Sequence, residues 1–273
     1  MEVNIVKEEE VELLVNELAE LYGYDFTNYA RASMRRRINR LITIDRLSSF
    51  AELLHRVRSD AGYLSHLVEE LTVNVTEMFR DPPVFKVIRE KVLPVLATHP
   101  FIRIWHAGCA TGEEVYSMAI LLDEANLMRK SLIYATDLNP SVIENIQKGI
   151  FPLSRMQQYS ENYILSGGKK DFSSFYTAQY GFAKFNQKLK QKMIAATHNL
   201  VSDRSFNEFQ LIFCRNVLIY FDKILQDKVL NLFDDSLEKL GILVLGSKEN
   251  LRFSSVAKKF VQFEKEKIWR KME

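Results

Sequence analysis

The 273-residue sequence predicts an α/β domain built on a parallel sheet and preceded by an entirely helical segment. Two observations carry this prediction. A strand pattern over residues 101–106 leads into a glycine turn, and helical apolar spacing begins at Glu113. The run 209–216 is almost continuously apolar, as in parallel strands that are buried on both faces.

Composition limits the class of protein and its partners. Apolar residues make up 47% of the chain and charged residues 26%, as in ordinary globular domains. A net charge of +2 suggests neither nucleic acid nor a membrane surface as partner. The two cysteines, Cys109 and Cys214, give no disulfide framework and suit a reducing cytosol. We therefore expect a cytoplasmic protein without a signal peptide or membrane span.

The first 72 residues follow helical periodicity throughout, which predicts four helices. Acids at 8–10 favour the start of the first helix. Thr27 or Asn28 is the expected N-cap of the second helix, and Ser49 with Glu52 forms a possible capping box for the third. A fourth helix is expected over about 60–71.

Charge is divided sharply within this helical segment. Residues 1–30 hold eight acids against one base, whereas residues 31–58 hold eight arginines against two acids. On the second helix, Arg36 and Arg40 should lie opposite the apolar stripe and Arg37 beside it. These arginines form either a solvated face paired with acidic neighbours or a docking surface for an acidic partner.

The segment 71–83 joins the helical part to the α/β part. Asp81 is expected to cap a helix that the proline pair at 82–83 opens and that runs to about Leu96. Polar residues interleaved with apolar ones precede this helix: Asn74, Thr76 and Arg80. This pattern indicates a partly buried loop, either the wall of a binding site or a simple capping segment.

The glycine turn at 108–112 is typical of a nucleotide site at the carboxyl end of a first strand. Its G-x-x-x-G spacing differs from that of a dinucleotide loop, and Glu113 and Glu114 stand where a phosphate would bind. Carboxylates there favour a cationic ligand, such as the sulfonium and ammonium groups of S-adenosylmethionine (SAM). The alternative is an ordinary turn whose acids stabilise the helix N-terminus.

The remaining α/β elements follow in order. A second strand over 132–137 ends in Asp137, a position that suits a carboxylate holding ribose hydroxyls. Further elements are expected as follows: a helix at about 140–148, a helix from Lys223 to Leu240 that stops at Gly241, a strand at 242–245, and two edge strands within 260–272.

Residues 150–198 break this alternation of strands and helices. A turn-rich stretch and a hairpin pattern at 180–185 predict a small β-subdomain inserted beside the sheet. Asn199 and Leu200 lie where the chain should return to the sheet.

Four motifs now occur in order: Asn74-x-Thr-x-x-Phe-Arg-Asp81, Gly108-Cys-Ala-Thr-Gly-Glu-Glu-Val-Tyr-Ser117, Ala135-Thr-Asp137, and Cys214-Arg-Asn-Val-Leu-Ile-Tyr-Phe-Asp222. Together they resemble the CheR-type chemotaxis receptor methyltransferases, over nearly the whole chain. The resemblance implies an all-α N-terminal domain at 1–72 and a Rossmann-like, SAM-dependent methyltransferase domain at 73–273. It also implies a β-subdomain inserted at about 150–198. In some members of the family, this subdomain clamps a peptide of the receptor. Here its stretch 167–183 is longer and more aromatic than the family's usual turn.

The resemblance implies an activity and a partner as well. The activity is methyl transfer from SAM to glutamate side chains of membrane chemoreceptors, giving methyl esters and S-adenosylhomocysteine. The implied partners are the cytoplasmic domains of these methyl-accepting receptors. From charge and composition we expect neither nucleic acid binding nor direct membrane insertion. Two alternatives remain open: methylation of a different acidic protein, and a SAM-binding regulatory module that has lost turnover.

Matched residue by residue, the family's SAM-site positions fall on Asn74, Thr76, Arg80, Gly108, Glu114, Asp137, Asn199, Leu200, Arg215 and Asn216. Arg80 and Tyr220 match residues near the transferred methyl group and are the expected catalytic residues. Arg36, Arg37 and Arg40 match the basic helix that meets acidic receptor helices. No metal site is expected, because none of the five histidines shows the spacing of metal ligands.

Overall fold

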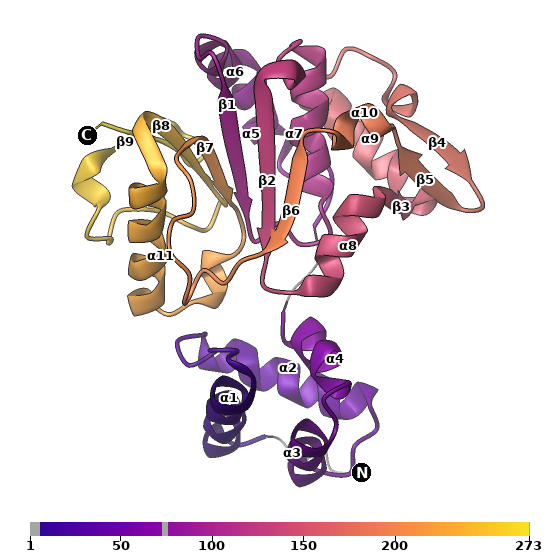
Figure 1. Ribbon diagram of the computed structural model, residues 1–273, viewed down its shortest axis with the longest axis vertical. Coiled ribbons are helices and arrows are strands. Elements are labelled where there is room, and N and C mark those ends of the chain that lie inside the picture. The colour runs from indigo at the N-terminus through magenta and orange to yellow at the C-terminus, as the bar shows by residue number, and fades with distance from the viewer. Residues whose placement is uncertain (1–5, 73–75, 273) are drawn as a thin grey trace.

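The computed structural model describes residues 6–72 and 76–272, in which a helical N-terminal domain lies against a larger domain with a central sheet (Figure 1). The helices of the N-terminal domain are α1 (Glu8–Tyr22), α2 (Arg31–Ile44), α3 (Phe50–Ser59) and α4 (Tyr63–Leu71). Their apolar faces meet in one buried cluster that includes Leu14, Ile38, Leu53 and Leu67. The four predicted helices are therefore confirmed.

Helix capping in this domain differs from prediction. Helix α2 begins after Ala30, so the expected cap at Thr27 or Asn28 is wrong. Thr27 instead donates its backbone N–H to the Asp25 carboxylate at 2.9 Å, in a turn that precedes the helix. Only half of the capping box predicted for α3 forms, because Ser49 accepts from the Glu52 N–H whereas the Glu52 carboxylate binds Ser48.

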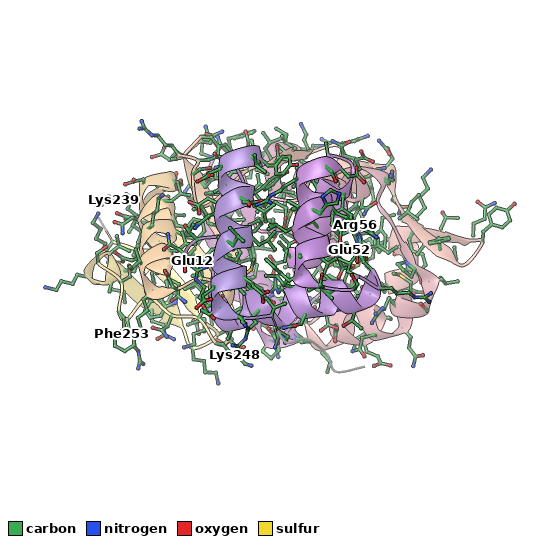
Figure 2. All side chains as sticks on the ribbon, turned by 90° about the horizontal axis from the view of Figure 1, so that it is seen from below. Glu12, Glu52, Arg56, Lys239, Lys248 and Phe253 are labelled. Atoms are coloured by element: carbon green, nitrogen blue, oxygen red, sulfur yellow. The ribbon has the colours of Figure 1, made fainter. Side chains whose placement is uncertain are left out.

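The N-terminal domain presents α1 and α3 on its side away from the sheet. Seen from below, Glu12 of α1 and the pair Glu52–Arg56 of α3 lie on this outer side (Figure 2). Helix α2 lies behind them, toward the second domain, which places it between the outer helices and the sheet (Figure 1).

A seven-stranded sheet in the order β6-β2-β1-β7-β8-β10-β9 forms the centre of the second domain. Its strands are β1 (Ile102–Ala107), β2 (Ser131–Asp137), β6 (Met193–Thr197), β7 (Phe209–Cys214), β8 (Leu237–Leu245), β9 (Phe260–Glu264) and β10 (Ile268–Lys271). The first five run parallel, and β10 is antiparallel to both of its neighbours. Because β1 lies between β2 and β7, the strand order reverses there, which is where open α/β sheets bind ligands.

Helices cover both faces of this sheet: α7 (Glu113–Glu124), α8 (Pro140–Lys148), α11 (Lys223–Ser236), and a helical run of α5 (Pro82–Val87), the π-helical turn η1 (Ile88–Val92) and α6 (Leu93–Leu96). The second domain has two apolar cores, and successive residues of β7 alternate between them. Leu211 and Phe213 belong to one core, and Ile212 and Cys214 to the other. The prediction that this apolar run is a strand buried on both faces is confirmed.

The inserted β-subdomain is a three-stranded sheet of β3 (Ile150–Pro152), β5 (Phe182–Phe185) and β4 (Tyr176–Gln179), with the helices α9 (Met156–Leu165) and α10 (Gln187–Lys190) beside it. The predicted hairpin forms, with Tyr180 and Gly181 both at positive φ in its turn. The insertion ends before residue 198, since β6 already pairs with β2 in the main sheet. The aromatic stretch 167–183 supplies Phe172 and Phe175 to the subdomain's buried core.

The helix predicted to run to Leu240 is shorter than expected. Helix α11 ends at Ser236, and β8 begins at Leu237, which is buried and pairs with Phe209. A register shift follows, where Leu240 has a φ of 67°. Gly241 therefore lies in an irregular strand and does not cap a helix.

Candidate functional site

A pocket lies at the carboxyl ends of β1, β2 and β7 and is lined by residues of both domains. It contains every predicted SAM-site residue that the structure describes: Thr76, Arg80, Gly108, Glu114, Asp137, Asn199, Leu200, Arg215 and Asn216. Tyr220 lines it as well, whereas Asn74 lies outside the described residues. The sheet topology thus brings together residues up to 140 positions apart, and their binding roles remain predictions.

The glycine turn keeps the floor of the pocket open. Gly108 has a φ of 72°, and a Cβ atom there would lie 2.5 Å from the Val217 Cγ2 atom. The backbone N–H groups of Gly108 and Cys109 both donate to the Thr136 carbonyl, at 2.8 and 3.0 Å. A side chain at position 108 would therefore collide with Val217 and disturb this turn.

The two glutamates at the start of α7 have different surroundings. Glu114 lines the pocket, but Glu113 turns away and accepts hydrogen bonds from Thr111 and Tyr159. Successive helical residues point about 100° apart, and here only Glu114 lines the pocket. The expectation that both acids face the ligand is therefore wrong for Glu113. Burial raises the pKa of the Glu113 carboxyl.

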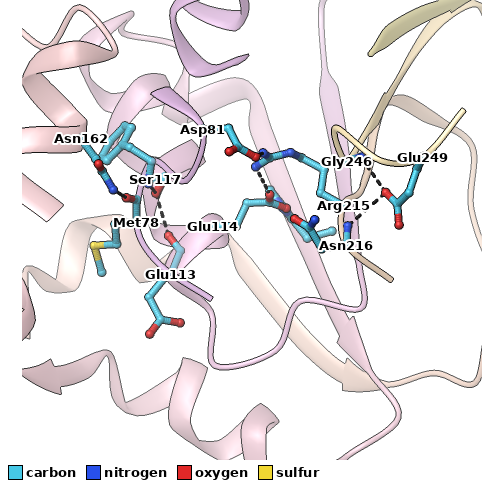
Figure 3. A network of polar contacts seen from close by, with 12 residues as sticks. Met78, Asp81, Glu113, Glu114, Ser117, Asn162, Arg215, Asn216, Gly246 and Glu249 are labelled. Carbon is cyan, nitrogen blue, oxygen red and sulfur yellow. Dashed lines mark hydrogen bonds and ion pairs between the residues drawn. The ribbon is translucent and has the colours of Figure 1, made fainter. Parts of the chain in front are cut away.

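A chain of charged contacts holds Glu114 in the pocket wall (Figure 3). His106 Nδ1 lies 3.0 Å from one carboxylate oxygen of Glu114, and Arg215 donates to the other at 2.9 Å. Burial alone would raise the pKa of Glu114, but the hydrogen bond from His106 and the charge of Arg215 outweigh it. The net result is a pKa below the usual value, so this carboxylate is charged at neutral pH.

Asp81 has a different role from the predicted cap. Its φ is 57° and its side chain makes no capping hydrogen bond to α5. Pro82 and Pro83 follow it and have no N–H to donate, so the first turn offers little to a cap. The carboxylate instead accepts a hydrogen bond from Arg215 at 2.6 Å (Figure 3).

Asp137 stands at the end of β2, as predicted, and lines the pocket. Its carboxylate accepts hydrogen bonds from the backbone N–H groups of Ala110 at 2.9 Å and Asn139 at 3.1 Å. Burial raises the pKa of Asp137, although these N–H groups oppose the shift. The same side chain therefore faces the ligand space and fixes the glycine turn.

Glu249 supports the segment behind the pocket wall, and the sequence did not single it out. It is 4% exposed and accepts hydrogen bonds from the N–H groups of Gly246, Asn216 and Ile219 (Figure 3). Asn216 has a φ of 62°, a strained conformation that these contacts stabilise. Glu249 thus shapes the segment from Arg215 to Tyr220, and only its position after an apolar strand could have suggested this role.

Arg37 does not lie on an exposed basic surface, and this expectation is wrong. The residue is 6% exposed, shares the buried face of α2 with Met34 and Leu41, and lines the pocket. Its guanidinium carbon lies 4.6 Å from the centre of the Tyr220 ring, and it donates to the Leu71 carbonyl. Burial lowers the pKa of Arg37.

Arg36 and Arg40 are exposed on the opposite side of α2, as the helical spacing predicts. Arg40 forms an ion pair of 3.0 Å with Glu70 while 64% of its side chain stays exposed. Both arginines are therefore accessible to a partner.

The charged, polar and apolar groups that line the pocket fit SAM. The charged carboxylate of Glu114 suits a cationic group, and that of Asp137 suits hydroxyls. Leu138, Leu200 and Val217 add apolar surface for a flat ring. Across residues 6–72 and 76–272, no cluster of three side chains is suited to a metal, and no helix is long and apolar enough to cross a membrane.

Comparison with known proteins agrees with this geometry. The family model described as CheR methyltransferase, SAM binding domain, matches residues 74–268, and that described as CheR methyltransferase, all-alpha domain, matches residues 9–72. A Pseudomonas putida protein named as a methyltransferase, Cher3, is 46% identical over 263 residues and 96% of each chain. Chemotaxis protein methyltransferase 1 of Vibrio cholerae is 34% identical over 230 residues and 80% of each chain.

A solved structure shows a more distant likeness. The N-methyltransferase NodS from Bradyrhizobium japonicum, in complex with S-adenosylhomocysteine, aligns with a TM-score of 0.41 and 13% identity. The alignment covers 72% of this chain and 90% of that one.

Proposed function

The chain belongs to the CheR methyltransferase family, and we propose that it methylates glutamate side chains of chemotaxis receptors with SAM as the methyl donor. The observation that carries this proposal is the pocket itself, in which Glu114 and Asp137 lie together with Arg80 and Tyr220. Relatives named chemotaxis protein methyltransferases, such as that of Vibrio cholerae, support the choice of substrate.

The chemistry asks little of the protein beyond positioning. SAM supplies a methyl group that is activated by a positively charged sulfur. A glutamate carboxylate is ionised at neutral pH and is itself the nucleophile, so the reaction needs no general base. The products are a glutamyl methyl ester and S-adenosylhomocysteine. The chain must hold the two partners in line and exclude water, which is catalysis by proximity and orientation.

The cofactor end of the pocket is assigned to three groups of residues. Glu114 holds the positively charged methionine part, and its own charge is maintained by His106 and Arg215. Asp137 accepts hydrogen bonds from the ribose. Asn199 and Leu200 border the adenine at the end of β6.

The reacting end is assigned to Arg80 and Tyr220. Arg80 orients the glutamate carboxylate through a charge-assisted hydrogen bond. The Tyr220 hydroxyl directs it by a second hydrogen bond, and Arg37 holds the Tyr220 ring by its contact at 4.6 Å.

The exposed arginines Arg36 and Arg40 are the proposed docking surface for the receptor. Substrates of this enzyme carry the glutamates to be methylated, so their surface is negatively charged at that point. Arginine side chains bind carboxylates in a bidentate manner, which favours this contact. We propose that docking and methylation take place in the cytoplasm, where the methyl-accepting domains of the receptors lie.

Transfer of tritiated methyl from SAM tests the proposal. The chain is incubated with a receptor cytoplasmic fragment, and release of the label as methanol in base identifies a glutamyl ester. A fragment with alanine at its methylated glutamates is the control and should take up no label. Label found only on another acidic protein would support a different substrate. SAM binding without transfer to any protein would support a regulatory module.

A further inference from the structure

Tyr29 connects the N-terminal domain to the pocket. It lies between α1 and α2, and its half-buried ring packs against two apolar clusters, the core of the N-terminal domain and the core beneath α11. Phe26 contacts the ring edge-on at a centroid distance of 5.0 Å, and Phe221 does the same from the second domain. The ring is therefore fixed from both domains.

The backbone around Tyr29 is tied to the segment that carries Tyr220. Tyr29 and Phe221 form an antiparallel bridge. The Ala30 N–H donates to the Tyr220 carbonyl at 2.8 Å, and the Asp222 N–H donates to the Asn28 carbonyl at 2.9 Å. These bonds place Tyr29 relative to the pocket and not merely relative to its own domain.

The Tyr29 hydroxyl is available to a ligand. Burial raises the pKa of Tyr29, and the charge of Asp137 raises it further while that of Arg37 lowers it. The phenol therefore stays protonated and can act as a hydrogen-bond donor. Tyr29 lines the pocket beside Asp137 and Leu138, and no hydrogen bond from its hydroxyl is found among the residues that the structure describes.

We propose that Tyr29 binds the adenosine part of the cofactor through its hydroxyl, so that both domains build the cofactor site. Asp137 accepts hydrogen bonds from the ribose in the proposed function, and Tyr29 supplies a donor beside it. The inference deepens that proposed site and rests on it for the choice of ligand part.

Calorimetry with S-adenosylhomocysteine tests this inference without any methyl acceptor. Tyr29→Phe keeps the ring between Phe26 and Phe221 and removes only the hydroxyl. Its affinity should fall about 2- to 12-fold, the range for one neutral hydrogen bond. Its thermal midpoint without ligand should stay that of the wild type.

A matched control comes from the same loop. Tyr24 stacks on Phe26 at 6.4 Å but does not line the pocket, so Tyr24→Phe should bind S-adenosylhomocysteine as the wild type does. Tyr29→Ala also removes the ring and should weaken binding more than Tyr29→Phe. Wild-type affinity in Tyr29→Phe overturns the inference, as does an equal loss in Tyr24→Phe.

The outcome separates this inference from the proposed function. Loss of affinity in Tyr29→Phe, with no methylation of receptor by the wild type, would remove the proposed substrate and leave Tyr29 as a cofactor residue. Receptor methylation by the wild type, with equal binding by Tyr29→Phe, would remove only the role of Tyr29.

Discussion

The Asp81 carboxylate and the Arg215 guanidinium, 134 residues apart in the chain, form a hydrogen-bonded ion pair with an N–O distance of 2.6 Å. Arg215 also binds Glu114, so one buried side chain links α7 to the loop that carries Arg80. Phe79 and Asp81 on either side of Arg80 have positive φ angles of 53° and 57°. Such conformations cost about 1–2 kcal/mol each for residues other than glycine, so tertiary contacts must hold them.

Asp81→Asn should weaken cofactor binding, because the ion pair with Arg215 holds the loop that carries Arg80 against the pocket. The variant keeps the shape of the side chain but removes its charge. Charged hydrogen bonds contribute about 1.5–3 kcal/mol, and partial exposure of Asp81 reduces this to about 1 kcal/mol, or roughly fivefold in affinity. Calorimetry with S-adenosylhomocysteine measures the change. Asp235→Asn alters an exposed acid of α11 and serves as control. Equal affinities in both variants would show that Arg215 positions the loop without Asp81.

Tyr220→Phe should reduce methyl transfer to receptor while changing product affinity little. The variant keeps the ring and hence its contact with Arg37. A single lost hydrogen bond in the transition state corresponds to a decrease of about 2- to 12-fold in turnover. Turnover is measured at saturating receptor and SAM, and Arg80→Ala should show a larger decrease. Wild-type turnover of Tyr220→Phe would mean that its hydroxyl takes no part in the reaction.

Replacing both Arg36 and Arg40 by glutamate should impair receptor methylation but not folding. Exposed ion pairs such as Arg40–Glu70 contribute only about 0–1 kcal/mol, so the unfolding midpoint should move little. Wild-type methylation should decline with salt, since exposed charges are screened beyond about 8–10 Å.

Arg37→Glu is the informative contrast on the same helix. A glutamate there would place a buried charge beside Tyr220, and we expect both stability and cofactor binding to fall.

If the double variant at 36 and 40 methylates receptor normally at low salt, docking lies elsewhere, first in the insertion around 150–190.

Glu113 and Glu114 should affect stability with opposite dependence on pH. The pKa of Glu114 is lowered from 4.5, so its contribution is present above pH 4.5 and is lost as the pH falls below it. The pKa of Glu113 is raised from 4.5, so the folded state binds its proton more tightly and loses stability as the pH rises above 4.5.

Urea unfolding at a series of pH values measures this difference. Glu114→Gln should flatten the stability curve below pH 4.5, and Glu113→Gln should flatten it above pH 4.5. Identical curves for the two variants would contradict the assignment of their surroundings.

The sequence predicted those features that depend on local patterns. Strand β7, helix α8 and the hairpin at 180–181 follow from periodicity and turn residues, and these predictions are confirmed. The motif residues converge on one pocket because parallel strands end at the same edge of a sheet.

Other features depend on contacts between distant parts of the chain, which local patterns do not encode. Helical spacing placed Arg37 at the border of the apolar stripe, but contacts with Leu71 of α4 and Tyr220 of the second domain decide that its side chain is covered. Asp81 resembles a cap until the two prolines and Arg215 are considered together. Glu249 gains its role from backbone N–H groups more than 25 residues away.

The pairing of residues 28–30 with 220–222 couples the helical domain to the backbone that carries Tyr220. Exchange of the helical domain between relatives is an attractive way to redirect such an enzyme to another receptor. A helical domain taken from another protein would bring a different residue to position 29 and a different backbone segment to the pairing with Phe221. If Tyr29 binds the cofactor as proposed, a chimera that breaks this pairing should change the affinity for the methyl donor along with the choice of target.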